Sequence, residues 1–240
     1  MSAKAFLYLL IAALANLAGA WLFLIKKQWE NESLRLWIGA GAGFMLAVAL
    51  AEMLPEANAR NNIVPVWTLA GFLFVHLFEH VLPPHFHYGH EHHGGLKAHV
   101  SVAATGGLIM HSVTDGVAIV AAVQVEPALG IFVLAAAVWH KVPSGFTVAS
   151  VVNATGGSRN SSLIAAASVG IGTVVGGILY AALPTGLWIG PALALSAGSL
   201  IYVAATDLLP EVNKRRSLLA PVGVIAGVGL FFLTHVLFEP

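Results

Sequence analysis

The sequence contains no cysteine, which excludes disulfide bonds and thiolate metal sites. Charge is scarce as well. Asp, Glu, Lys and Arg make up 9% of the 240 residues, whereas about a quarter of the residues in an ordinary soluble domain are charged. So few charges cannot cover the surface of a soluble globule. The composition therefore excludes a soluble protein, a nucleic-acid binder and a disordered chain, and the zero net charge favours no particular partner.

Apolar residues dominate what is present, at 58% of the chain with a mean hydropathy of +0.85. The apolar runs extend for about 20 residues without strict alternation, which is typical of membrane-spanning helices and not of a β-barrel. We predict one transmembrane domain over residues 1–240, with a histidine-rich cytoplasmic loop at 84–97. A window of about 19 residues predicts eight spans: Ala3–Ile25, Leu36–Ala57, Val66–Leu82, Ala98–Gln124, Pro127–Val152, Ser161–Leu183, Leu187–Glu211 and Leu218–Phe238.

The basic residues of the loops predict the orientation, because Lys and Arg accumulate on the cytoplasmic side. The loops after the first, third, fifth and seventh spans contain Lys26, Lys27, Arg35, Lys97, Arg159, Lys214, Arg215 and Arg216. The opposite side has only Lys4 and Arg60. We therefore expect a multi-pass protein of the cell (plasma or inner) membrane, with the N- and C-termini outside.

Two segments that are 155 positions apart are similar. Glu52–Glu56 reads Glu-Met-Leu-Pro-Glu and Asp207–Glu211 reads Asp-Leu-Leu-Pro-Glu, and their spans are expected to run in opposite directions. A weaker similarity relates His111–Gly116 to His140–Gly145. The pattern favours an all-α polytopic membrane protein with eight transmembrane helices arranged as three + two + three with inverted repeats, a construction typical of secondary transporters. The alternative is chance similarity between helices rich in small residues.

The two central spans contain strongly polar side chains. His111 and Asp115 are four residues apart and share one helix face. Each central span begins about 13 residues before its histidine, roughly 20 Å along a helix axis, so His111 and His140 are expected to meet near mid-membrane. Two imidazoles and a carboxylate suit Zn²⁺ or a neighbouring divalent metal. The alternative is buried histidines that bond only to backbone carbonyls.

With these motifs in place, the chain resembles the ZIP (ZRT/IRT-like protein) metal-ion transporters along nearly its whole length. The matching segments are Glu52–Glu56, Phe78–His80, the His-Ser-x-x-Asp-Gly at 111–116, the His-Lys-x-Pro-x-Gly at 140–145, Ala197–Val203 and Asp207–Glu211. The resemblance implies a main transport site formed by His111, Asp115, His140 and the position of Ser144, with a contribution from Met45.

The chain departs from the family pattern in two places. Ser144 stands where family members commonly have Glu, and serine is a far weaker ligand. Ser112 and Lys141 stand where members with two adjacent metals have acidic or amide groups. We expect the Lys141 ammonium to replace the second cation and to pair with Asp115, which predicts a one-metal site. The alternatives are a retinal Schiff base, against which the eight spans argue, and a lysine that only pairs helices.

Other polar groups lie at the expected ends of the spans. We expect Glu52 and Glu56 at the entrance and Asp207 and Glu211 at the exit, and the alternative for these four carboxylates is a polar helix-terminal anchor. We also expect a cytoplasmic patch of His76, Glu79 and His80. The loop histidines would collect metal weakly and exchangeably, and are His85, His87, His90, His92 and His93. The alternative for them is a solvated polar loop.

Taken together, the sequence predicts a transporter of zinc or a similar divalent cation into the cytoplasm by alternating access, through relative motion of the two repeat elements about a nearly fixed site. The direction follows from the resemblance alone. We expect no enzyme activity and no cofactor, because the metal is the transported substrate. The expected partners are divalent metal ions and the lipid bilayer, with no nucleic acid. A homodimer is possible. The rival functions are an intramembrane zinc-dependent hydrolase and a metal sensor without flux.

Overall fold

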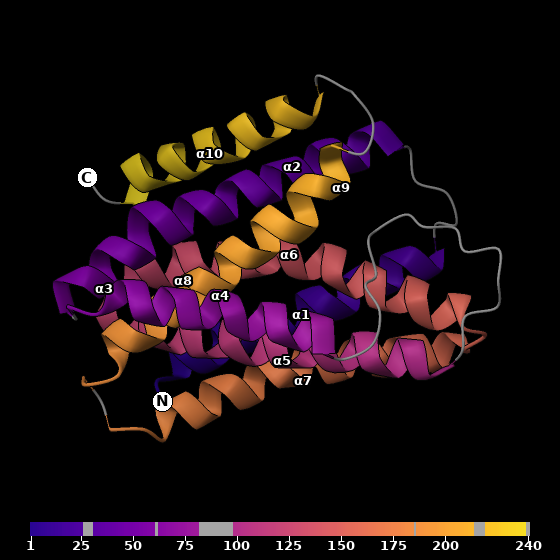
Figure 1. Ribbon diagram of the computed structural model, residues 1–240, viewed down its shortest axis with the longest axis horizontal. Helices are drawn as coiled ribbons and strands as arrows, with labels where there is room; N and C mark the ends of the chain where they lie inside the picture. The colour runs from indigo at the N-terminus through magenta and orange to yellow at the C-terminus, as the bar shows by residue number, and fades with distance from the viewer. Residues whose placement is uncertain (26–30, 61, 82–97, 185, 214–218, 239–240) are drawn as a thin grey trace.

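The structure, a computed structural model, describes residues 1–25, 31–60, 62–81, 98–184, 186–213 and 219–238, and every regular element in these ranges is helical (Figure 1). The elements are α1 (Ala3–Ile25), α2 (Asn31–Ala47), η1 (Val48–Met53), α3 (Leu54–Arg60), α4 (Val64–Val81), α5 (Ala98–Val125), α6 (Pro127–Ala154), α7 (Arg159–Ala181), α8 (Ile189–Tyr202), η2 (Val203–Leu208), α9 (Leu209–Asn213) and α10 (Leu219–Phe238).

Each of the eight predicted spans coincides with one helix or one continuous helical run, and the ends differ by a few residues. Six of these stretches are long and apolar enough to cross a membrane. Two shorter apolar stretches, Val64–Phe78 and Pro221–Val236, lie in α4 and α10. The predicted all-helical class is therefore confirmed.

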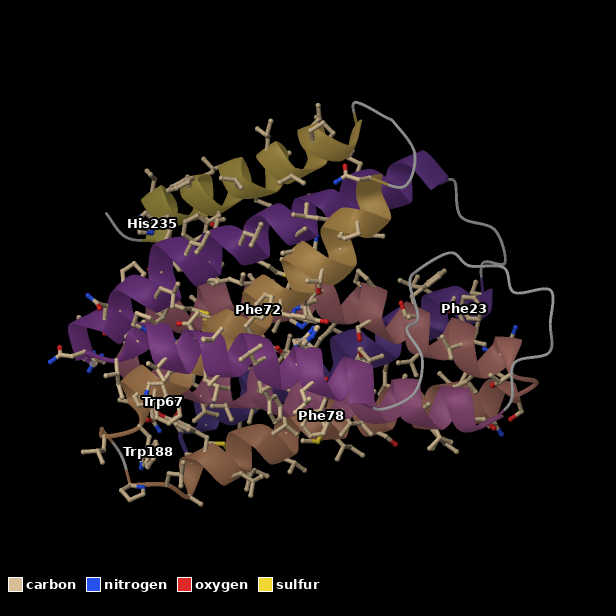
Figure 2. The ribbon with its side chains drawn as sticks, viewed as in Figure 1. Phe23, Trp67, Phe72, Phe78, Trp188 and His235 are labelled. Carbon is tan, nitrogen blue, oxygen red and sulfur yellow. The ribbon has the colours of Figure 1, made fainter. Side chains whose placement is uncertain are left out.

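The outer surface of the described helices is strongly apolar. Leu14 is 60% exposed, Ile171 is 59% exposed and Ile225 is 70% exposed, and each lies on a different long helix. Large exposed apolar faces of this kind are unfavourable in water and favourable against lipid. Figure 2 shows Trp67 and Trp188 together at one end of the molecule, with ring centroids 6.3 Å apart, and paired tryptophans at helix ends are typical of a membrane interface.

Two helical runs contain a widened turn of π-helix, η1 and η2, and each widened turn precedes a proline. Proline lacks a backbone N–H and its ring clashes with the carbonyl four residues earlier. At both places the hydrogen bond just before the proline reaches back five residues: the Leu54 N–H donates to the Ala49 carbonyl, and the Leu209 N–H donates to the Ala204 carbonyl. The two bonds are 155 positions apart, the same interval as between the two Leu-Pro-Glu motifs.

Close helix contacts through glycine repeat at the same interval. A Cβ on Gly43 of α2 would lie 2.1 Å from the Val224 carbonyl oxygen of α10, and a Cβ on Gly198 of α8 would lie 1.9 Å from the Thr68 carbonyl oxygen of α4. Small residues let two backbones approach this closely inside a membrane. The packing of α2 on α10 is thus the counterpart of the packing of α8 on α4.

The central helices show the same correspondence. Gly116 of α5 lies against the carbonyl of Thr173 in α7, and Gly145 of α6 lies against the carbonyl of Asn16 in α1. The long helices consequently form two packing groups. The α5/α6 group is α1, α5, α6 and α7, and the α2/α8 group is α2, α4, α8 and α10; the largest contact between the groups is that of α5 with α8.

Figure 1 shows the start of α1 and the end of α10 at the same end of the molecule as α3. Both ends of the described chain therefore lie on one side along the helix direction.

Candidate metal centre

His111 and Asp115 of α5 and His140 of α6 converge in the interior. Each offers one ligand atom, and these atoms all lie within 4.8 Å of one another. All three side chains are at most 5% exposed. The two helices can bring them this close because α5 and α6 pack directly on each other. The predicted meeting of the two histidines and the carboxylate is therefore present in the structure.

The separations of the polar atoms match those around a tetrahedral metal ion. His111 Nε2 lies 3.3 Å from His140 Nε2, and His140 Nε2 lies 3.1 Å from Asp115 Oδ2. His111 Nε2 lies 3.6 Å from Asp115 Oδ1. Metal–ligand bonds of about 2.0–2.1 Å in tetrahedral geometry place neighbouring ligand atoms about 3.3 Å apart.

The ring of His140 is oriented by its own helix. Its Nδ1–H donates to the Ala136 carbonyl at 2.8 Å, one turn earlier in α6. A carbonyl only accepts, so the proton of the neutral ring sits on Nδ1 and the lone pair of Nε2 points at Asp115 and His111. Histidines that bind metal are commonly held in this way by a bond to the second ring nitrogen.

Lys141 occupies the space beside the three ligands. Its Nζ lies 2.8 Å from Asp115 Oδ2 and donates to Ser112 Oγ at 3.0 Å, and the side chain is 1% exposed. An ammonium group this deep in an apolar helix pair requires a counter-charge, and Asp115 supplies it. The expected pairing of Lys141 with Asp115 is thus observed, and its role as a substitute cation stays a prediction.

Ser144 and Met45 are the remaining expected ligands. Ser144 is half-buried and follows His140 by one turn of α6, and Met45 of α2 is fully buried in the core. Their contribution to metal binding stays a prediction.

Sequence reasoning missed two residues that contact predicted site residues. Ser199 of α8 places its Oγ 3.0 Å from His111 Nδ1, and nothing in the sequence distinguishes this serine from other small polar residues of a helix. His235 of α10, labelled in Figure 2, places its Nδ1 2.6 Å from Glu52 Oε1. His235 had a usable signal, because it is the one ionisable residue in the apolar sequence of α10.

The other predicted groups are dispersed. Glu56 pairs with Arg60 one turn further along α3, and the exposed His76 packs its ring edge against Tyr202. The side chains of Glu79, His80, Asp207 and Glu211 lie outside the described part of the structure. The loop residues His85, His87, His90, His92 and His93 also lie outside the described residues.

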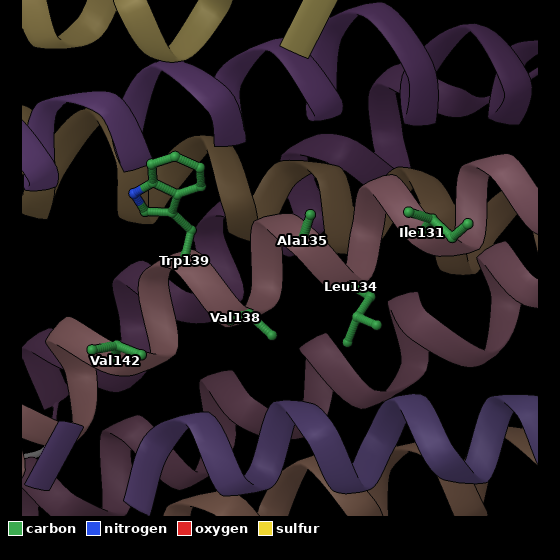
Figure 3. A pocket seen from close by; sticks show the side chains of 6 residues that line it. All are labelled: Ile131, Leu134, Ala135, Val138, Trp139 and Val142. Atoms are coloured by element: carbon green, nitrogen blue, oxygen red, sulfur yellow. The ribbon is translucent and has the colours of Figure 1, made fainter. Parts of the chain in front are cut away.

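An apolar hollow of about 380 Å³ is lined by residues of α6 that are close in sequence to His140. Figure 3 shows its lining: Ile131, Leu134, Ala135, Val138, Trp139 and Val142. The lining side chains offer no carboxylate, imidazole or hydroxyl group. A hydrated cation is therefore not stabilised by this lining.

The apolar helices and the buried cluster together describe a multi-pass membrane protein with a site suited to divalent metal. Comparison with known proteins agrees. The family model "ZIP Zinc transporter" matches residues 99–235. The chain is 26% identical over 253 residues to proteins named zinc transporter ZupT from Escherichia coli O7:K1 and from E. coli O157:H7, with 96% of this chain and 95% of the relative covered.

The chain belongs to the ZIP zinc transporter family, because the family model covers more than half of it. This family consists of transporters and not of enzymes, so the intramembrane hydrolase is no longer needed to explain the buried histidines.

Proposed function

We propose that this protein carries zinc or a similar divalent cation across the inner membrane into the cytoplasm through the centre formed by His111, Asp115 and His140. One observation carries the proposal. The Nδ1 bond of His140 to a carbonyl leaves Nε2 of the neutral ring as an acceptor, and this Nε2 lies 3.3 Å from His111 Nε2 and 3.1 Å from Asp115 Oδ2. Two ring nitrogens and a carboxylate at these distances form a ligand set for a divalent cation.

The arrangement that fits this role has eight crossing helices in three + two + three order, with inverted repeats and both termini outside. The matched π-turns, the matched glycine contacts and the common end of α1 and α10 support it. The excess of Lys and Arg in the odd-numbered loops supports the orientation.

The mechanism is alternating access by relative motion of parts of the molecule about a site of nearly fixed composition. The packing groups indicate where the motion occurs. All three ligands lie on α5 and α6 of the α5/α6 group, whose largest contact with the α2/α8 group is that of α5 with α8. Movement of one group along the other would expose the centre first to one side and then to the other.

We assign carboxylates to the two ends of the metal transport path. Glu52 and Glu56 receive metal at the entrance, where His235 stands beside Glu52, and Asp207 and Glu211 release it at the exit. On the cytoplasmic side, His76, Glu79, His80 and the loop histidines accept the metal weakly and pass it on.

Uptake of ⁶⁵Zn²⁺ into proteoliposomes tests the proposal. His111→Ala and Asp115→Asn each remove a ligand and are expected to lower uptake at least 100-fold. The matched control is Ser162→Ala, which removes a fully buried hydroxyl that bonds only to backbone carbonyls of Ala149 and Ser158. Normal uptake by a well-folded His111→Ala protein would refute the assignment. Transport of many Zn²⁺ ions per protein molecule would exclude a metal sensor without flux.

A further inference from the structure

A chain of hydroxyl groups connects His111 to its own backbone through the neighbouring helix. His111 Nδ1 lies 3.0 Å from Ser199 Oγ, Ser199 Oγ lies 3.0 Å from Thr114 Oγ1, and Thr114 Oγ1 lies 2.6 Å from the His111 carbonyl oxygen. All three side chains are at most 5% exposed. Ser199 belongs to α8 in the α2/α8 group, whereas His111 and Thr114 belong to α5 in the α5/α6 group.

The direction of every bond in this relay is determined by its last member. The His111 carbonyl only accepts, so the Thr114 hydroxyl must donate to it. The Thr114 oxygen then accepts the proton of Ser199, and the Ser199 oxygen is left to accept from His111. The His111 proton is therefore on Nδ1, and Nε2 presents its lone pair to the centre.

We propose that Ser199 is a positioning residue for transport: its hydroxyl holds His111 ready to bind metal, and it does so only while α8 lies against α5. The inference rests on the proposed function and adds to it. His140 is oriented by its own helix through Ala136, so its orientation persists when the groups move. His111 depends on a residue of the other group, and loses its bond to Ser199 as soon as α8 shifts.

This asymmetry makes the strength of metal binding depend on conformation. With Ser199 in place, the centre has two oriented imidazoles and a carboxylate. After a shift of α8, one imidazole is free to rotate and to change its protonated nitrogen. Loss of a partner that orients a ligating histidine typically weakens metal binding 10–100-fold. Movement of the groups would thus itself loosen the ion for release.

The test compares four variants of the full-length protein. Ser199→Ala removes the acceptor for His111, and Ser199→Thr restores a hydroxyl at the same position. Thr114→Val breaks the relay without altering α8. The matched control is Ser196→Ala, because Ser196 is as buried as Ser199 on the same helix and donates to the Thr114 carbonyl at 3.1 Å without touching a histidine.

Ser199→Ala is expected to raise the Zn²⁺ dissociation constant and the KM for uptake at least 10-fold, with the maximal rate retained. Nitrogen-15 NMR of the labelled histidines is expected to show the His111 proton on Nδ1 in the parent and distributed over both nitrogens in Ser199→Ala. Ser199→Thr should recover parent-like binding, and Thr114→Val should weaken it.

Parent-like affinity and a parent-like His111 spectrum in Ser199→Ala would overturn the relay, as would equal weakening in Ser196→Ala. If Ser199→Ala does not fold, Thr114→Val and the spectrum of the parent decide. These outcomes leave the proposed function standing, since that function fails only if His111→Ala transports normally.

Discussion

At the scale of single residues, Asp115 lies close to three buried side chains at once. Its Oδ2 lies 2.8 Å from Lys141 Nζ and 3.1 Å from His140 Nε2, while Oδ1 faces His111 at 3.6 Å. Under the proposed function, one carboxylate balances the buried ammonium and also binds the passing metal. The Lys141 charge lowers the affinity for a second cation beside the first, which is why we expect a single ion in this centre.

Substitution of Lys141 tests this interpretation. In Lys141→Ala without metal, Asp115 is left as a buried carboxylate with no cation, and breaking such a pair costs about 3–5 kcal/mol of stability. We expect a lower melting temperature that recovers on addition of Zn²⁺. We also expect altered metal selectivity, partial transport and a second bound ion, counted by anomalous diffraction from metal-soaked crystals.

The comparison for Lys141→Ala is Ser112→Ala, which loses the hydroxyl but keeps the ammonium beside Asp115. Ser112→Ala should bind one ion as the parent does. If Lys141→Ala also binds one ion and selects among metals as the parent does, Lys141 only pairs helices and the substitute-cation idea is wrong.

The residues that sequence reasoning found are those whose chemistry is conspicuous in an apolar span. His111, Asp115 and His140 stand out because ionisable groups are costly in a membrane and their spacing places them on facing helix sides. Ser199 could not be found in the same way. Serine is common in membrane helices, and its closeness to His111 arises from the packing of α8 on α5, which no local pattern encodes.

At the scale of elements, the spans were predictable and their interruptions were not. The hydropathy of each span follows from about 20 consecutive apolar residues, which a sliding window detects. The division of two spans into α2, η1 and α3 and into α8, η2 and α9 depends on which carbonyl accepts the bonds displaced by Pro55 and Pro210. That choice is made by the surrounding packing.

Two glycines of α10 provide a test of the close helix contacts. A Cβ on Gly227 would lie 1.9 Å from the Ala40 carbonyl oxygen of α2, whereas a Cβ on Gly229 would have nothing within 4 Å. Gly227→Ala must push the helices apart and is expected to cost about 1–3 kcal/mol. Gly229→Ala should be neutral or stabilising by up to about 1 kcal/mol, because alanine favours helix.

Thermal unfolding of both glycine variants in the same detergent measures the difference. Equal melting temperatures for the two would mean that α2 and α10 are not in contact at Gly227.

At the scale of the whole molecule, the repeat and the packing divide the chain differently. The repeat interval relates the first three spans to the last three, yet α1 packs with α7 and α6, while α2 packs with α10. Each packing group therefore contains helices from both repeats. A sequence repeat reports which helices are equivalent, whereas the grouping depends on tertiary contacts such as that of Gly145 with Asn16. The interface at which the proposed motion would occur is consequently visible only in the structure.

The orientation of the molecule in the membrane is the last prediction, and the absence of native cysteine makes it simple to test. Asn62 lies in the exposed turn between α3 and α4, and Asn160 is exposed in the first turn of α7. The charge pattern places Asn62 outside and Asn160 in the cytoplasm. In intact cells, a membrane-impermeant maleimide should therefore label Asn62→Cys and should label Asn160→Cys only after permeabilisation. The unsubstituted chain supplies a background of zero. The reverse labelling pattern would mean that the protein has the opposite orientation in the membrane. Glu52 and His235 would then lie on the cytoplasmic side, and the structural basis for uptake towards the cytoplasm would be lost.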